Sequence, residues 1–213
     1  MSFGGHKDIG EIKTDFNRAI TYGGSEEIQV KIKEQLASIA SKSPKAAKII
    51  AELENSKHRH HIAPIKYDKQ DPVTKTLNLE DSKNGKGSPT EIYYNPESNK
   101  VSKNLAGERI EFNPEEVLSH EISHAGDSNR GNNSEIMDKD RKQNQKETNA
   151  IIVQNEVSKS DNRKTRTYHS LRREIERRKR EDALRSDGRL SSWEYLDDNN
   201  YKPNYEKDDD KTK

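Results

Sequence analysis

The chain has 213 residues and no cysteine; 27% of its residues are hydrophobic and 36% are charged, with a formal net charge of +1. The lack of cysteine excludes a disulfide framework, a thiolate metal site and a cysteine nucleophile. The near-zero net charge gives no overall attraction to nucleic acid or to an anionic membrane. This share of apolar residues is too small for a core that includes the whole chain. We therefore expect a compact middle part of the chain with polar ends.

The first 24 residues are polar and close on Gly23-Gly24, which predicts a mobile leader. Residues 1–10 lack a basic stretch followed by an apolar one, so we expect no ordinary secretory signal. No apolar run approaches the length of a membrane span. The pattern is that of a protein that stays in the cytosol or is exported by a route that reads no cleavable signal.

Residues 25–55 have the apolar spacing of helices. A second apolar run follows Pro44, and a proline suits the first turn of a helix. The first stripe consists of Ile28, Val30, Ile32, Leu36, Ile39 and Ala40. We therefore expect two helices that face the core.

Two short segments predict strands, with a loop over residues 80–89 before the second. Residues 61–67 contain Pro64, which favours an edge strand because proline lacks an N–H. Residues 90–96 combine β-branched and aromatic residues and end in a turn. Such a strand beside an active-site helix is also a place where a substrate backbone can pair. The histidines at 58–61 are spaced badly for joint metal binding, so we interpret them as a solvated loop or the start of a strand.

The most informative motif is the sequence His-Glu-Ile-Ser-His at residues 120–124. Histidines four residues apart lie on one face of a helix, so His120 and His124 can bind the same Zn²⁺ ion. Glu121 projects beside them and can accept a proton from metal-bound water. Asn113 as a cap and Pro114 in the first turn predict where this helix begins.

A catalytic zinc site usually has a third protein ligand. Arg130 stands ten residues after the first histidine, which excludes the metzincin pattern. The candidates are Glu147, on a helix predicted for residues 146–157, and, less favoured, Glu156 and Asp127. Residues 126–145 are rich in Gly, Asn and Asp, which predicts a loop. A glutamate on a separate helix after such a loop is the gluzincin arrangement, whereas an aspartate so close to the motif is better placed to orient the loop or an imidazole.

Residues 163–180 contain nine Lys or Arg and two Glu. Arg163, Arg166 and Tyr168 follow the glutamate helix closely enough to fold back and donate to a tetrahedral oxyanion. A solvated basic helix explains the two arginines equally well. An alternative function is therefore a zinc-stabilised binding module that uses this segment to engage an acidic protein or nucleic acid, and another is a different hydrolase on the same scaffold. The intact Glu121 and the scarcity of aromatic residues favour the peptidase.

The order of these segments resembles the NleD-type family of zinc metallopeptidases, which pathogens inject through type III secretion. The likeness covers about residues 25–170. It is carried by the segments Ile49-Ile50-Ala51-Glu52-Leu53, Ile92-Tyr93-Tyr94-Asn95-Pro96, the HExxH helix with Ala125 and Asp127, Glu147-Thr148-Asn149-Ala150, Asn155-Glu156, and Arg166 with Tyr168.

The resemblance implies an α+β, zincin-like fold, in which a small β-sheet packs on the HExxH helix and a glutamate ligand helix. It implies one Zn²⁺ bound by His120, His124 and Glu147, with Glu121 as base and Arg166 and Tyr168 as further catalytic residues. It also implies endopeptidase activity in a host cell, where the best-known member cleaves stress-activated MAP kinases.

The expected organisation is a leader over residues 1–24, a metallopeptidase domain over 25–170 and a charged helix and tail over 171–213. We expect a monomer that is delivered into the host cytosol and acts on a host protein, with neither nucleic acid nor membrane as its partner.

Overall fold

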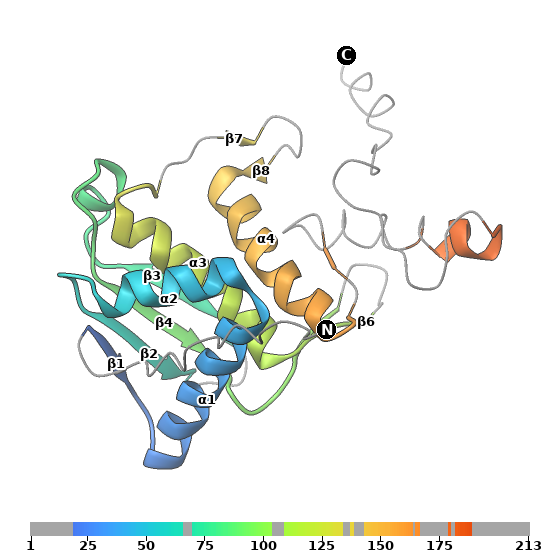
Figure 1. Ribbon diagram of the computed structural model, residues 1–213, viewed down its shortest axis with the longest axis horizontal. Coiled ribbons are helices and arrows are strands. Elements are labelled where there is room, and N and C mark those ends of the chain that lie inside the picture. Colours follow the sequence, from blue (N-terminus) through green and yellow to red (C-terminus); the bar gives the residue numbers. More distant parts are fainter. Residues whose placement is uncertain are drawn as a thin grey trace, which may run out of the picture.

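The computed structural model has an α+β architecture, which confirms the α+β part of the predicted fold class (Figure 1). The residues it describes are 19–65, 70–103, 109–133, 137–138, 143–163, 165–166, 179 and 182–188. The helices are α1 (Glu26–Lys42), α2 (Pro44–Glu54), α3 (Pro114–Arg130), α4 (Gln145–Ser160) and the short 3₁₀ helix η1 (Asp81–Lys83). The strands are β1 (Ile20–Tyr22), β2 (His60–Pro64), β3 (Val73–Thr76), β4 (Thr90–Tyr94), β5 (Lys100–Lys103), β6 (Arg109–Phe112), β7 (Met137–Asp138) and β8 (Gln143–Asn144).

The main sheet has the strand order β1-β2-β4-β3. The first three strands of that order are parallel, and β3 pairs antiparallel with β4 at the edge. Helix α3 packs against β3 and β4 and also against α1, α2 and α4 (Figure 1). It therefore lies at the centre of the fold, which places any residue on its sheet-facing side next to the edge strand.

The structure confirms the two helices expected over residues 25–55. Ser43 ends α1 and its hydroxyl accepts a hydrogen bond from Ala46 N, so it also caps α2, with Pro44 in the first turn. Helix α2 approaches α3 very closely at Gly126, where an added Cβ would lie 2.7 Å from Cγ2 of Ile49. The apolar faces of these helices and of the sheet form one core that includes Ile32, Leu36, Ile50, Ile92, Leu118 and Ile122.

The edge position predicted from Pro64 is wrong, because β2 lies between β1 and β4. The reason is that Pro64 ends the strand. Ile65 N donates to Tyr94 O of β4, and successive residues of a strand direct their backbone groups to opposite neighbours, so the nitrogen of Pro64 faces β1. Strand β1 has already ended at Tyr22. No N–H is needed there, and a central strand tolerates the proline.

Of the two interpretations of the histidines at 58–61, the start of a strand is confirmed, because His60 begins β2; His60 is buried there and not solvated. Its Nδ1 lies 2.8 Å from Oγ1 of Thr90 and its Nε2 lies 3.3 Å from Oδ1 of Asn129. Burial lowers the pKa of His60 to about 4, against 6.5 for a free side chain. His60 is therefore a hydrogen-bonded core residue.

The strand predicted over residues 90–96 is present as β4, but a substrate backbone cannot pair with it, because β2 and β3 occupy both of its sides. The sheet edge beside α3 is β3, which sequence patterning did not indicate. Residues 20–22, assigned to the leader, form β1 and pair with β2. Within the described ranges, no helix combines the length and apolar character that a membrane crossing requires.

Candidate metal centre

Helix α3 starts where the sequence predicted, with Asn113 as its cap. Oδ1 of Asn113 accepts from Glu116 N at 2.7 Å, and Oε2 of Glu116 accepts from Asn113 N at 2.8 Å, so the two residues form a reciprocal capping box. The helix continues to Arg130 and ends at Gly131, which adopts a left-handed conformation with φ 73°. Residues 126–130 therefore belong to α3, although we expected them in the loop over residues 126–145.

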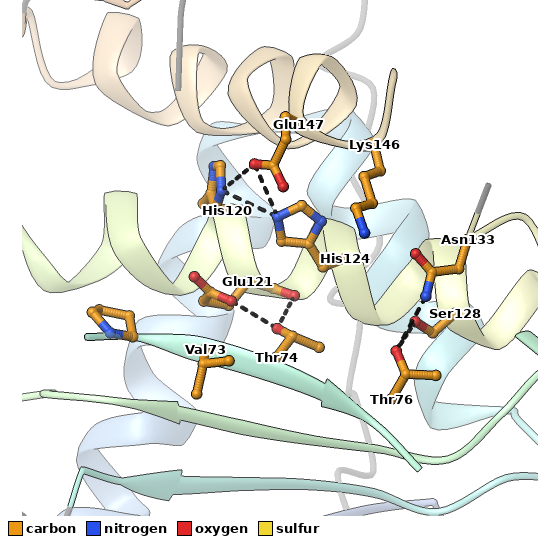
Figure 2. Close-up of a pocket in the computed structure, with 11 residues that line it drawn as sticks. Val73, Thr74, Thr76, His120, Glu121, His124, Ser128, Asn133, Lys146 and Glu147 are labelled. Atoms are coloured by element: carbon orange, nitrogen blue, oxygen red, sulfur yellow. Dashed lines mark hydrogen bonds and ion pairs between the residues drawn. The ribbon is translucent and has the colours of Figure 1, made fainter. Parts of the chain in front are cut away.

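The structure brings His120, His124 and Glu147 together. The two histidines lie one turn apart on α3, and Glu147 lies in the first turn of α4 and faces them (Figure 2). The Nε2 atoms of the histidines are 3.2 Å apart, and Oε2 of Glu147 lies 3.5 Å from each. These three side chains could hold a metal ion.

The spacing of the three donor atoms provides a test of that fit. Zinc bonds to nitrogen and oxygen ligands at roughly 2.0–2.2 Å, so neighbouring ligands of a tetrahedral ion lie roughly 3.3–3.5 Å apart. The observed separations of 3.2, 3.5 and 3.5 Å match such a triangle. Two imidazoles and one carboxylate are also a donor set that catalytic zinc accepts.

The electrostatic environment differs between the two histidines. Burial, together with the charge of Arg166, holds the pKa of His120 well below its usual range. Burial also acts to lower the pKa of His124, but hydrogen bonding to Glu147 and the charges of Glu121 and Glu147 raise it overall. A neutral imidazole is the form that binds a metal, and His120 already favours it.

Glu121 lies beside the cluster, on the side of α3 that faces β3 (Figure 2). The hydroxyl of Thr74 lies 2.8 Å from Oε2 of Glu121 and 2.9 Å from its backbone oxygen. Burial raises the pKa of the Glu121 carboxyl, although His124 and Thr74 act in the opposite direction. The arrangement holds a carboxylate in a fixed orientation next to the three donor atoms.

Arg166 does not line the pocket with these residues; it lies behind His120. Its Nη2 donates to Nδ1 of His120 at 2.8 Å, and its guanidinium stacks 5.1 Å from the centre of the Phe112 ring. Asn155 fixes its backbone through hydrogen bonds to both N and O. These contacts hold the guanidinium against the His120 imidazole. Because a guanidinium only donates, Nδ1 accepts in this contact, whereas a neutral imidazole that binds a metal through Nε2 carries its proton on Nδ1. Tyr168 lies outside the described residues.

The other predicted candidates lie elsewhere. Arg163 donates to Oε2 of Glu116 at 3.1 Å and so binds the start of α3. Asp127 forms an ion pair of 2.8 Å with Arg130 and lines a separate cavity between α2, α3 and α4. Glu156 accepts from Ser43 and pairs with Lys45 at the start of α2. None of the three belongs to the group of donor atoms around His120.

The cluster opens into a pocket of about 220 Å³. Its lining includes residues that sequence patterning missed: Thr74, Thr76, Ser128, Asn133 and Lys146. No local signal marks the threonines, because their place depends on the pairing of β3 with β4. Lys146 could have been found, since it precedes Glu147 on the same helix.

A family model for effector proteins, Peptidase_M91, matches residues 16–182 of the chain. Among the curated proteins, no sequence matches.

Proposed function

This chain belongs to the Peptidase_M91 family of effector proteins, and from that premise we propose that it is a zinc-dependent endopeptidase that cleaves a host protein. The family assignment establishes an effector peptidase. The observation that carries the finer proposal is the geometry of His120, His124 and Glu147, with the Glu121 carboxylate beside them in an open pocket. The proposal includes a zincin-like fold for the domain over residues 25–170.

A zinc ion held by the three ligands would supply the Lewis acidity that polarises a water molecule and the scissile carbonyl. Glu121 takes the proton from that water and delivers it to the leaving amine. Burial raises the pKa of Glu121, which brings it closer to the neutral range in which a general base and acid works best. Thr74 keeps the carboxylate turned toward the pocket.

The remaining residues have supporting roles in this proposal. Arg166 packs against Nδ1 of His120, and in this proposal zinc binding at Nε2 goes with a proton on Nδ1 and a shift of the guanidinium away from it. Because that contact lies behind the ligand, we assign the stabilisation of the oxyanion to Tyr168, as the resemblance to the NleD-type family implies. The substrate backbone pairs with the edge of β3 that no strand of the described residues occupies, beside which Glu121 lies.

The same resemblance supports the biological setting. We propose that the protein acts as a monomer in the host cytosol after type III secretion, with a stress-activated MAP kinase as the first candidate substrate. The charged segment over 171–213 is, in this proposal, not needed for the chemistry, whereas residues 20–22 of the expected leader belong to the main sheet as β1.

Two measurements on purified protein test the peptidase. Metal analysis should find about one zinc per chain, in wild type and in Glu121→Gln alike, because an amide at position 121 leaves the ligands intact. Mass spectrometry of new N-termini in host lysate should then find cleavage with wild type and none with Glu121→Gln, since an amide cannot accept the proton. Protein that takes up no zinc, or equal cleavage by both, contradicts the proposal.

A further inference from the structure

The pocket beside the metal centre has two chemically different ends (Figure 2). At one end lie the three donor atoms, Glu121 and Thr74. At the other end lie Thr76, Ser128, Asn133 and Lys146, where a cation and several neutral polar groups meet. The proposed chemistry uses only the first end, so the second end is a feature that the mechanism leaves unassigned.

Lys146 brings the positive charge to this second end. Its side chain is partly buried and points from the first turn of α4 into the pocket (Figure 2). Among the described residues, no carboxylate forms an ion pair with its ammonium group. The carboxylates that line the pocket are Glu121 and Glu147, and both belong to the catalytic end. An ammonium in such a place binds an anion from solution or from a ligand.

The hydroxyl groups at this end provide a further donor. Oγ1 of Thr76 and Oγ of Ser128 are 2.8 Å apart, so one of the two hydroxyls donates to the other. Asn133 Nδ2 points at Oγ1 of Thr76 from 3.3 Å and is itself a donor. The second hydroxyl proton therefore has no acceptor within this group and can be donated to a ligand. The lysine and this hydroxyl both favour a negatively charged partner.

The distance between the two ends fits neighbouring residues of one peptide. Thr74 and Thr76 lie two positions apart on β3, on the same face, which corresponds to about 7 Å along the strand. A substrate that pairs with the edge of β3 in extended form would advance by about 3.4 Å per residue. A side chain one or two residues from the scissile bond thus reaches Lys146.

We propose that Thr76, Ser128, Asn133 and Lys146 form a specificity subsite that accepts an anionic side chain within two residues of the cleaved bond. This inference rests on the proposed peptidase function and deepens it. The anion is the carboxylate of Asp or Glu or the phosphate of a phosphorylated residue, since both have oxygen acceptors for the ammonium and the hydroxyl. Lys146 selects the substrate and takes no part in moving the proton.

A library of peptides derived from a digested proteome, incubated with the zinc-loaded protein, tests the subsite without knowledge of the natural substrate. At one position within two residues of the cut, wild type should prefer Asp, Glu or a phosphorylated residue over their neutral analogues by about tenfold in kcat/KM. Lys146→Glu should reverse the preference at that position toward Lys and Arg, and Lys146→Arg should keep it. Parallel phosphorylated and dephosphorylated libraries distinguish the two anions.

Lys159→Glu is the matched control, because Lys159 is exposed in the last turn of the same helix; it should keep the wild-type preference. Binding of fluorescent peptides to Glu121→Gln gives a second readout, in which the additional Lys146→Glu change should weaken the binding of acidic peptides and leave that of neutral peptides unchanged.

Cleavage that depends on Glu121 but shows no preference for an anion overturns the subsite and leaves the peptidase function. Equal loss of kcat on every peptide in Lys146→Met also overturns it, because Lys146 would then act in the chemistry. No cleavage that depends on Glu121 contradicts the peptidase function itself, and the subsite with it.

Discussion

Three side chains from two helices converge at the candidate metal centre, and other side chains on the same helices do not. Glu147 and Glu156 both lie on α4, yet the first faces His120 and His124 and the second pairs with Lys45 and Ser43. Spacing along α4 explains the difference, because nine residues place the two carboxylates two and a half turns apart, on opposite faces of the helix. The role of each glutamate is therefore testable by the same substitution.

We expect Glu147→Ala to weaken zinc binding by at least about 100-fold, because it removes a ligand. Glu156→Ala, the matched control, should change the affinity by less than about threefold, since its carboxylate binds α2. Asp127→Ala should have an intermediate effect of at most about tenfold, because its charge acts on His124 only from a distance. Competitive titration with a zinc indicator measures all three. A larger loss in Asp127→Ala than in Glu147→Ala would assign the third ligand to Asp127.

His60 makes the stability of the fold depend on pH. Its pKa is about 4 in the folded protein and 6.5 in the free side chain, so between these values the unfolded chain takes up a proton that the folded chain does not. The stability that the neutral side chain contributes is complete above pH 6.5 and is lost as the pH falls to 4. The linkage amounts to about 3 kcal/mol.

We therefore expect the free energy of unfolding of wild type to fall by about 3 kcal/mol more than that of His60→Gln between pH 7 and pH 4. Urea denaturation in the presence of a chelator measures it without a contribution from bound metal. His61→Gln is the matched control and should keep the pH dependence of wild type. Identical slopes for wild type and His60→Gln would show that His60 takes up its proton without cost in the folded state.

At the scale of elements, a buried network joins the start of α3 to the end of α4. Glu116 accepts from Ser158 at 2.6 Å and from Arg163 at 3.1 Å, in addition to its role in the capping box. The side chain is almost fully buried. Helices α3 and α4 thus run antiparallel, connected by Glu116 at one end and by the donor atoms of the metal centre at the other.

Glu116→Ala should lower the free energy of unfolding by about 3 kcal/mol, because it leaves Arg163 and the helix start without their shared acceptor. Glu115→Ala, in the same turn, should cost less than about 1 kcal/mol, since its ion pair with Lys42 is partly exposed. Denaturation monitored by circular dichroism measures both. Equal losses would mean that Glu116 acts only as a cap.

Sequence patterning predicted the helices well and the strands unevenly, for physical reasons. The stripe in α1, the proline in α2 and the cap of α3 are local signals, which do not depend on the rest of the fold. Strands β1 and β3 have three and four residues, too few to show an alternation, and the polar sequence Val73-Thr74-Lys75-Thr76 has only one covered face. A central strand can contain Pro64 only because β1 ends before it, and the sequence around Pro64 does not show where β1 ends.

The metal centre shows the same division. The HExxH spacing located three of its residues, because both histidines and the glutamate lie within one helix turn and a half. Glu147 required a choice between three carboxylates, and the structure brings that residue to the histidines. Thr74 could not be found in this way, because its contact with Glu121 joins residues 47 positions apart through the register of the sheet.

At the scale of the whole molecule, the metal would connect segments that are remote in the chain and that no disulfide connects, since the sequence contains no cysteine. Zinc at about 1,000 times its dissociation constant would add about 4 kcal/mol to the stability of the folded state. For a domain of this size, that corresponds to a rise in Tm of about 10 °C.

Thermal denaturation with zinc and with a chelator should show this difference for wild type and for Glu121→Gln. His124→Ala, which lacks a ligand, should show almost none. A Tm that does not respond to the chelator in any variant would mean that no metal holds α3 and α4 together.

The network around Glu116 also fixes one end of α4, so that any tilt of the helix displaces its other end. Eleven residues separate Ser158, at the fixed end, from Glu147, at the metal centre, which corresponds to about 16 Å along the helix axis. A tilt of α4 by about 3° about the fixed end would displace the Glu147 carboxylate by nearly 1 Å, whereas metal–ligand distances tolerate only about 0.2 Å. A small change of angle at the Ser158 end of α4 thus moves the Glu147 carboxylate by more than a metal site would tolerate. The residues that would set the coordination geometry therefore include some that lie far from the candidate metal centre.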